Sequence, residues 1–403
     1  MATSSVEARS DSDGAPLTPQ LSALLADLQS RGLRVEEPVE ARQPAGSAGA
    51  ALEARRGGAG PADAGMLWVE GVAVTVPVAA PFVAGSPYLL RPEAEDEYAI
   101  YRDGERVASA RRTTRPRYYD LTTEDGIPYW QIALLHLDSV ASTVIQTCMY
   151  WDTADVCQFC GIELSLRAGR TIPVKRPEHL AEVAVAARDL DGAVDATLTT
   201  GTTHGHDKGA TYIGRCAQAI KQASGLPVEV QFEPPDDLEV LDQVHEMGAD
   251  SVGMHVESFD PEVLGRIAPA KARTGIEGYF RAWEHAVEVF GRGQVSTYVI
   301  LGMGEDADQT VAGCRRAIDL GVYPFVVPLR PVPGTPLGDV LPPDPEYMES
   351  VYRRVVPYLV ARGLGSWNVR AGCARCQACS AMTAMERSLG HDGRASLPLL
   401  EIR

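Results

Sequence analysis

Short apolar runs alternate with amphipathic segments over the central half of the chain. The apolar runs are rich in β-branched residues and fall at 140–147, 193–199, 227–232, 250–256, 295–301 and 323–329. Between them, apolar residues recur with the spacing of one helix face, most clearly at 177–188, 237–247 and 310–320. Strands that alternate with helices are typical of a parallel sheet covered by those helices. The pattern therefore predicts an α/β fold.

The number of these units narrows the architecture. Six units span roughly 200 residues, whereas a closed eight-unit barrel takes about 250 residues. We therefore predict a partial (β/α)6 TIM-like barrel. A doubly wound sheet is the alternative, because the order of strands cannot be read from the sequence. In both folds, ligands bind beyond the carboxyl ends of the parallel strands.

The segments that flank the predicted barrel differ from it in composition. The first residues are rich in Ala, Gly, Ser and Pro, and only 21–28 shows helical apolar spacing, so we expect a disordered or loosely structured tail. Short β-type runs then suggest a small β-rich cap, and the last part combines a helix with closely spaced cysteines. The predicted division is a tail at 1–63, a cap at 64–135, a barrel at 136–342 and a Cys-rich extension at 343–403.

Charge and cysteine content limit the classes of function. The net charge of −17 disfavours nucleic acid and anionic membrane surfaces as partners. The sequence shows neither a secretory leader nor an apolar run of about 18 residues, so we expect a cytoplasmic protein without membrane association. Cysteines stay reduced in the cytoplasm, and the 8 cysteines of this chain then favour metal or redox chemistry over disulfides.

Three of these cysteines follow the first apolar run of the barrel, at Cys148, Cys157 and Cys160. Three thiolates are one short of the four that saturate a [4Fe–4S] cluster, so a cluster held by them keeps one iron open. The alternative is zinc, because Cys-x2-Cys is half of a typical four-thiolate zinc site.

A strand followed by three cysteines, with Phe159 just before the last, resembles the radical S-adenosylmethionine (radical SAM) superfamily. Eight residues separate Cys148 from Cys157, a minority spacing in that superfamily. The resemblance implies that the three cysteines hold a catalytic [4Fe–4S] cluster whose open iron binds S-adenosylmethionine. An electron from a flavodoxin- or ferredoxin-type partner then cleaves the cofactor, and the resulting 5′-deoxyadenosyl radical takes hydrogen from a small-molecule substrate.

The same resemblance assigns cofactor contacts further along the chain. Phe159 would shield one side of the site, and the turn at Thr200, Gly201 and Thr202 would meet the methionine amino group, with Thr202 in place of the usual acidic residue. Glu257 would bind ribose hydroxyls or an ammonium group; as an ordinary loop residue it would be solvated beside a helix cap from Ser258 or Asp260.

A later strand and its continuation supply the remaining predicted contacts. Ile300 and Gly302 would lie along the adenine, although Gly302 also suits an ordinary strand-to-helix turn. Arg330 would meet a carboxylate of cofactor or substrate, or would be a surface residue. His204 and His206 are expected to face the cavity, where histidine moves protons or binds metal, or to be solvated.

A second group of cysteines lies near the C-terminus, at Cys373, Cys376 and Cys379. Their spacing is close to that of bacterial iron–sulfur proteins. We predict a second iron–sulfur cluster that relays electrons or binds substrate; zinc with one outside ligand and a redox or structural role are the alternatives. Cys216 and Cys314 lie singly in helical patterns and are expected to be packed thiols, unless one of them supplies a fourth thiolate.

Four segments together show a finer resemblance over about residues 65–400. The loop at Cys148, the segment 201–209, the segment 331–337 and the Cys373–Cys379 run are similar to the radical SAM protein of nitrilase-associated gene clusters. This implies a role in nitrile or cyanide metabolism, an implication by association. Two other functions stay open: a zinc-stabilised α/β binding protein without radical chemistry, and a sulfur-inserting enzyme similar to biotin synthase.

Overall fold

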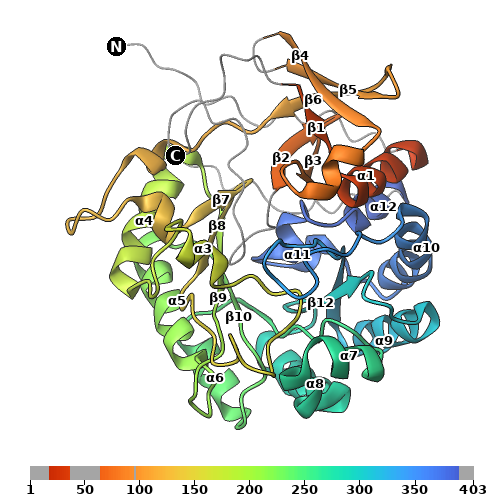
Figure 1. Cartoon of the computed structure of the whole chain (residues 1–403). Coiled ribbons are helices and arrows are strands. Elements are labelled where there is room, and N and C mark those ends of the chain that lie inside the picture. The colour runs from red at the N-terminus through yellow and green to blue at the C-terminus, as the bar shows by residue number, and fades with distance from the viewer. Residues whose placement is uncertain (1–17, 37–63, 95–96, 390–403) are drawn as a thin grey trace.

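The larger of two sheets has seven strands in the order β13-β12-β11-β10-β9-β8-β7. In this computed structural model, which describes residues 18–36, 64–94 and 97–389, β8 to β13 are parallel and only β7 is antiparallel (Figure 1). Its strands are β7 (Leu134–His136), β8 (Ser139–Thr143), β9 (Asp195–Thr199), β10 (Val228–Gln231), β11 (Ser251–Gly253), β12 (Val295–Leu301) and β13 (Val322–Pro328). Because the parallel strands follow one another in chain order, the sheet is a partial barrel and the doubly wound alternative is wrong.

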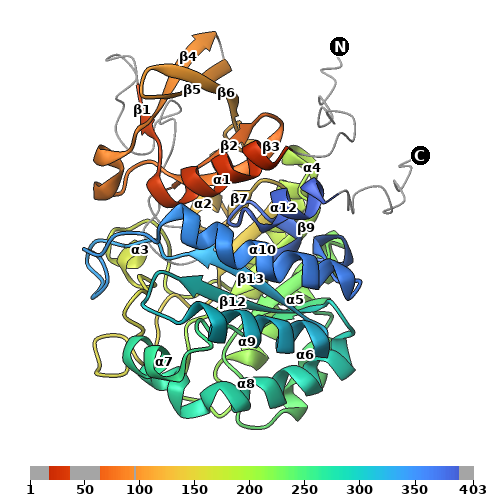
Figure 2. The ribbon, with the colours of Figure 1, turned by 90° about the vertical axis from the view of Figure 1, so that its right-hand side faces the viewer.

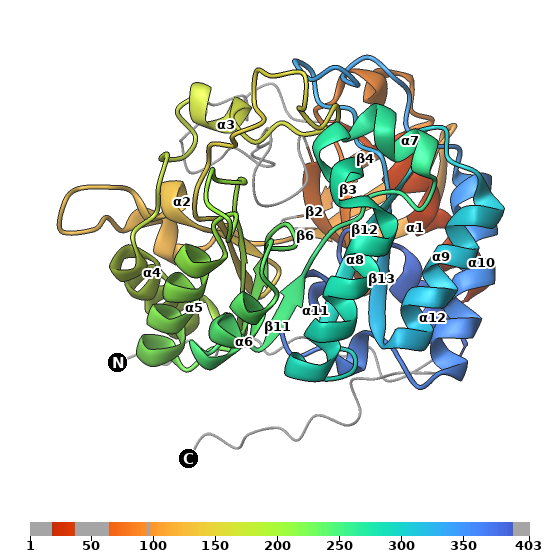
Figure 3. The same ribbon diagram turned by 90° about the horizontal axis from the view of Figure 1, so that it is seen from below.

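Helices cover the outside of this sheet (Figure 3). They are α3 (Leu164–Arg167), α4 (Pro177–Asp191), α5 (Ala210–Ser224), α6 (Glu239–Glu246), α7 (Pro261–Ile267), α8 (Pro269–Phe290) and α9 (Ala307–Leu320). Helix α5 shows why they form, since its buried Ile213, Cys216, Ala217 and Ile220 lie on one face at helical spacing. Asp260 caps α7 by accepting from the backbone N–H of Glu262. The predicted (β/α)6 barrel is confirmed.

A second sheet, of six strands, lies against one side of the barrel (Figure 1). Its order is β1-β4-β5-β6-β2-β3, and apart from the parallel β1–β4 pair it is antiparallel. Its strands are β1 (Arg34–Val35), β2 (Ala64–Val69), β3 (Val72–Pro77), β4 (Tyr88–Ala94), β5 (Glu97–Arg102) and β6 (Glu105–Arg112). Short helices accompany it at η2 (Pro81–Gly85), η3 (Arg117–Asp120) and α2 (Tyr129–Ile132). We call this six-stranded sheet the cap.

The helical spacing at 21–28 is confirmed by a helix, and the expected loose tail is wrong for the rest of 18–36. Helix α1 (Pro19–Arg31) starts at Thr18, whose side chain accepts from the backbone N–H of Leu21. Leu25 and Leu28 are 1% and 0% exposed, and β1 pairs with β4. These residues therefore belong to the packed core of the cap. The rest of 1–63, namely 1–17 and 37–63, lies outside the described residues.

The C-terminal segment packs between the cap and the barrel (Figure 2). It contains α10 (Pro345–Ala361), η4 (Ser366–Asn368), α11 (Cys373–Cys376) and α12 (Met382–Ser388). Cys376 Sγ lies 3.7 Å from the carbonyl oxygen of His136 on β7, whereas Val326 of β13 donates its N–H to Met382 Sδ at 3.3 Å. The segment therefore spans the lateral opening between the two edge strands of the partial barrel.

Two further expectations concern the course of the chain. The first barrel strand ends at Thr143 and not at residue 147 as expected. The boundaries predicted for the tail, cap, barrel and extension stay predictions. Across the described ranges, no helix combines the length and apolar character needed to cross a bilayer.

Candidate functional site

The loop that carries Cys148, Cys157 and Cys160 leaves the carboxyl end of β8. It is fixed at both ends by backbone hydrogen bonds. Met149 donates its N–H to the carbonyl oxygen of Thr202 at 2.8 Å, and Gln158 donates to that of Ile267 at 2.8 Å. The loop is thereby tied to the turn after β9 and to the end of α7, so its cysteines are held at the barrel mouth.

The three thiols line a common cavity of about 190 Å³. All three cysteines are free and partly buried. The wall also contains residues from the predicted cofactor turn and from the strand ends, namely Phe159, Ile162, Thr200, Gly201, Thr202, Glu257 and Lys271. The cavity lining therefore agrees with the expectation that the cysteine loop, the predicted cofactor turn and Glu257 lie close together.

Gly201 shows how tightly the turn approaches the cysteine loop. Its N–H donates to the carbonyl oxygen of Ile145 at 2.8 Å. A Cβ added at Gly201 would lie 1.9 Å from the carbonyl oxygen of Thr147, the residue just before Cys148. Only glycine fits at this position without moving backbone.

Glu257 is an almost fully buried carboxyl side chain in the cavity wall. It is 5% exposed and has a φ of 68°, a strained backbone conformation for a residue other than glycine. One carboxylate oxygen, Oε1, accepts from Lys271 Nζ, while Oε2 has no partner among the described residues. Burial alone would lower the pKa of Lys271, but the Glu257 carboxylate holds it well above its ordinary value. Burial raises the pKa of Glu257 and Lys271 opposes that shift, and one carboxyl oxygen is left free at the cavity.

His255 supplies a neutral ring beside Glu257. Its ring stacks on Tyr298 with centroids 4.4 Å apart, and its Nδ1 accepts from the backbone N–H of Tyr298 at 3.2 Å. Burial, helped by Lys271, lowers the pKa of His255 to about 3. Because Nδ1 is an acceptor, the proton of the neutral ring sits on Nε2, which has no partner among the described residues. The ring therefore offers a hydrogen-bond donor.

Three thiols are a donor set of the kind that iron–sulfur cores use. Within the described ranges, no three His, Cys, Asp or Glu side chains converge as a single metal ion requires. A cluster is larger than one ion and takes its thiolates further apart. Burial raises the pKa of Cys157, and it raises the pKa of Cys160 to about 11. Metal coordination displaces such protons.

A second, larger cavity of about 330 Å³ adjoins the first. The two share Phe159, Cys160, Thr199, Gln231, His255 and Glu257. The remaining wall comes from the strand interiors, the cap and the C-terminal segment, and includes Met66, Thr75, Ile300, Arg330, Cys373, Cys376 and Cys379. The chain thus places both cysteine groups at one connected space inside the barrel.

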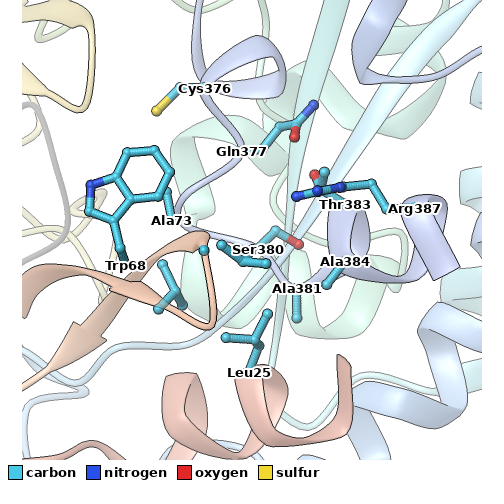
Figure 4. A pocket seen from close by; sticks show the side chains of 13 residues that line it. Leu25, Trp68, Ala73, Cys376, Gln377, Ser380, Ala381, Thr383, Ala384 and Arg387 are labelled. Atoms are coloured by element: carbon cyan, nitrogen blue, oxygen red, sulfur yellow. The ribbon is translucent and has the colours of Figure 1, made fainter. Parts of the chain in front are cut away.

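The cap and the C-terminal segment meet on the outer side of Cys376. Figure 4 shows a small pocket there, lined by Leu25, Trp68 and Ala73 of the cap together with Ser380 and other residues of the C-terminal segment. Thr75 of β3 donates its N–H to the carbonyl oxygen of Ala378 at 2.7 Å. The cap therefore holds the cysteine run in place from outside.

The remaining predicted residues divide into two groups. Ile300 and Arg330 line the larger cavity and not the smaller one. Gly302 lines neither cavity; its φ is 101°, and an added Cβ would lie 2.8 Å from Pro343, so the glycine serves a tight strand-to-helix turn.

The two loop histidines and the two single cysteines lie away from both cavities. His204 and His206 are exposed, and His206 Nδ1 pairs with Asp236 at 3.1 Å, so the expectation that they face the cavity is wrong. Cys216 and Cys314 are fully buried in α5 and α9 and line neither cavity. They are packed thiols, as one reading expected, and neither is in position to be a fourth ligand.

Sequence reasoning missed three wall residues that the fold brings to Glu257. His255 precedes it by two residues, Lys271 lies on α8, and Gln231 ends β10. The buried lysine had a visible signal, because the chain has few lysines and Lys271 follows a helix-starting Pro269. The contact itself depends on how α8 packs.

Comparison with known proteins agrees with the site. Residues 154–317 match the family model of the Radical SAM superfamily. A stretch of 131 residues is 28% identical to bacteriochlorophyllide c C-7(1)-hydroxylase of Chlorobaculum limnaeum and spans 32% of this chain and only 33% of that protein.

Solved structures with related chains have low overall similarity. Methylornithine synthase (PylB) has a TM-score of 0.42 at 17% identity and covers 62% of this chain and 79% of its own. A radical SAM methyltransferase from Sphaerobacter thermophilus has a TM-score of 0.42 at 15% identity, covering 72% and 76%. The family match rests on residues 154–317, which include Cys157 and Cys160: the chain carries a domain of the radical SAM superfamily, whose members use a [4Fe–4S] cluster and S-adenosylmethionine.

Proposed function

We propose that this protein is a radical SAM enzyme that cleaves S-adenosylmethionine reductively and takes hydrogen from a small-molecule substrate. The observation that carries the proposal is the common lining of one cavity. Cys148, Cys157 and Cys160 line it together with the turn at 200–202 and Glu257. These are the groups needed to hold a three-thiolate cluster and a cofactor with an ammonium group beside it.

The cysteine loop would hold the cluster, and the cavity wall would hold the cofactor. When bound, the cluster and S-adenosylmethionine supply one-electron cleavage of a carbon–sulfur bond and hydrogen abstraction. The chain's own part is to orient and to exclude water. Phe159 lines the same cavity and would shield one side of the cluster, and the backbone of Gly201 approaches closely because no Cβ intervenes.

Glu257 and His255 would bind the polar groups of the cofactor. The free Oε2 of Glu257 accepts from a hydroxyl or ammonium group, and Lys271 holds the carboxylate in place through Oε1. His255 offers Nε2–H as a donor. Since both line the larger cavity as well, they stand between the proposed cofactor and the proposed substrate.

The substrate would lie in the larger cavity. Its volume of about 330 Å³ is at the small end of ligand sites, which favours a small molecule. Nitrile or cyanide metabolism stays part of the proposal through the finer family resemblance. So do a flavodoxin- or ferredoxin-type electron donor and a cytoplasmic setting, where thiols remain reduced.

The zinc-stabilised binding protein is the rival function. It would use Cys157 and Cys160 as half of a four-thiolate site. The metal content of the purified protein separates it from a cluster.

Anaerobic purification and reconstitution with iron and sulfide test the proposal. We expect a brown protein that forms 5′-deoxyadenosine from S-adenosylmethionine when reduced with dithionite. Cys157→Ala should abolish the product, whereas Cys314→Ala, a matched change at a packed thiol, should leave it unchanged. A colourless wild-type protein that contains only zinc would overturn the proposal.

The substrate class needs a separate experiment. Deuterated nitriles are incubated with the reduced protein and S-adenosylmethionine, and mass spectrometry follows deuterium in 5′-deoxyadenosine. Transfer identifies the hydrogen donor. If 5′-deoxyadenosine forms without transfer from any nitrile, the nitrile assignment fails while the radical SAM assignment stands.

A further inference from the structure

The C-terminal cysteine run lies outside the matched residues 154–317, yet it reaches the interior of the barrel. Cys373, Cys376 and Cys379 all line the larger cavity, and Cys160 of the first group lines it too. The shared cavity therefore places the C-terminal cysteines at the same space as Cys160, although the two groups lie far apart in the sequence.

Buried carboxylates lock this run to the amino ends of the barrel strands. Gly372 donates its N–H to Asp195 Oδ2 at 2.8 Å, and Cys373 donates its N–H to Glu229 Oε2 at 3.1 Å. Arg375 forms ion pairs with Asp195 and with Asp138, the latter at 2.7 Å. Asp195 is 0% exposed, so this anchor is shielded from water. The three thiols are therefore held on a fixed backbone.

Glycine is required at the start of the run. Gly372 has a φ of 99°, and an added Cβ would lie 2.0 Å from Glu229 Oε2. The chain thus turns sharply against the buried carboxylate and directs α11 toward the cavity. A site with several thiolates needs its backbone held this firmly, so that the sulfur atoms keep fixed positions relative to one another.

The surroundings of the thiols suit an anionic sulfur core. Gln231 Nε2 lies 3.5 Å from Cys373 Sγ, and Tyr298 lines the same cavity as this thiol. Arg330 lies near Cys379 and donates through Nη2 to the carbonyl oxygen of Thr75 at 2.7 Å. Its Nη1 has no partner among the described residues. Donors to sulfur and a nearby cation stabilise a thiolate-bound core.

A fourth thiolate is not available to complete the site. Every cysteine of the chain lies in the described ranges, and Cys216 and Cys314 are packed in helices away from the cavity. Three cysteines that bind a core therefore leave one coordination position without a cysteine.

We propose that Cys373, Cys376 and Cys379 hold a second iron–sulfur core whose remaining coordination position faces the shared cavity. The substrate then binds between the two cysteine groups, and a nitrogen, oxygen or sulfur donor atom of it occupies that position. This inference deepens the proposed function. It rests on that function only where it places a first core at Cys148, Cys157 and Cys160.

Two triple variants separate the two cores. Variant A carries Cys373→Ser, Cys376→Ser and Cys379→Ser, and variant B carries the same change at Cys148, Cys157 and Cys160. After anaerobic reconstitution, we expect each variant to keep roughly half the iron of the wild type, with the remaining core visible by Mössbauer spectroscopy. Cys314→Ala should keep all of it.

Each contrary result has a distinct meaning. If variant A keeps the full iron content, or if the C-terminal group holds zinc in the wild type, the second core is refuted and the proposed function stands. If variant B keeps the full iron content, the first core fails instead. Circular dichroism checks folding, and should variant A not fold, a wild-type iron content of a single core refutes the second core.

The facing coordination position has its own readout. Variant B contains only the second core, and cyanide ion is added as a small probe ligand after reduction. We expect a shift in the electron paramagnetic resonance spectrum and, with carbon-13 cyanide, a hyperfine coupling to carbon. A spectrum that cyanide leaves unchanged would show that the position is filled by the protein and would overturn this part.

Discussion

Lys271 on α8 binds one oxygen of the Glu257 carboxylate and leaves the other free at the cavity of Cys148, Cys157 and Cys160. The lysine also donates to the carbonyl oxygen of His255 at 2.9 Å. One ammonium group therefore contacts two of the polar residues that border both cavities. Lys271 opposes the rise that burial causes in the pKa of Glu257, and it does so while contacting only one of the two carboxyl oxygens.

The first prediction concerns the free oxygen of Glu257. Glu257→Gln removes the charge but keeps the shape, so binding of S-adenosylmethionine should weaken by roughly 10- to 100-fold, the usual loss of one charge-assisted hydrogen bond. Isothermal titration calorimetry measures the affinity, and iron content should not change. Asp236→Asn, at a half-exposed surface carboxylate, serves as control. If the affinity for S-adenosylmethionine did not change, Glu257 would not bind the cofactor and would be an ordinary loop residue.

The second prediction concerns the close approach at Gly201. Gly201→Ala places a Cβ against the carbonyl oxygen of Thr147 and must move the start of the cysteine loop. We expect destabilisation of about 1–3 kcal/mol by overpacking, together with reduced iron uptake. Urea unfolding and iron analysis measure the two effects.

Gly265→Ala is the matched control, because Gly265 lies in α7 and an added Cβ there meets no atom within 4 Å. It should raise the unfolding free energy slightly, by about 0.5–1 kcal/mol, because alanine is the better helix former, and it should leave iron uptake unchanged. If both variants had the same unfolding free energy and the same iron uptake, the contact with Thr147 would not limit either quantity.

The third prediction concerns the anchor of the C-terminal run. Arg375→Ala leaves Asp195 and Asp138 buried without their cation, which should cost about 3–5 kcal/mol of unfolding free energy. Arg353→Ala removes an exposed helical pair with Glu349 and should cost at most about 0.5 kcal/mol. Urea denaturation compares them, and a similar small loss in both would mean that the C-terminal run is not part of the cooperative fold.

The fourth prediction concerns helix α1. Leu28 is 0% exposed, so Leu28→Ala should destabilise the protein by about 2–5 kcal/mol through a cavity in the core. Leu121→Ala, at a residue 40% exposed, should have little effect. Thermal unfolding measures the difference, and an equal midpoint for both variants would contradict the packing of α1 into the cap.

The barrel strands could be predicted because each is a short apolar run between amphipathic helices. The prediction failed where local composition and packing disagree. Residues after Thr143 continue the apolar run, but the N–H of Gln146 bonds to the loop at Pro173 and not to a strand. The apolar spacing at 21–28 indicated helix α1, but the sequence did not show that this helix and β1 pack into the cap, because that packing depends on distant strands.

The sequence by itself determined the strand–helix alternation, the two groups of three cysteines and the family to which 154–317 belongs. These features depend only on which residues stand at which spacing within short segments. Only the tertiary structure decided that Lys271 meets Glu257, that His204 and His206 face solvent, and that the Cys373–Cys379 run enters the same space as Cys160. The physical reason is that contacts between distant segments depend on how helices and strands pack, and periodicity reports only which face of each element is buried.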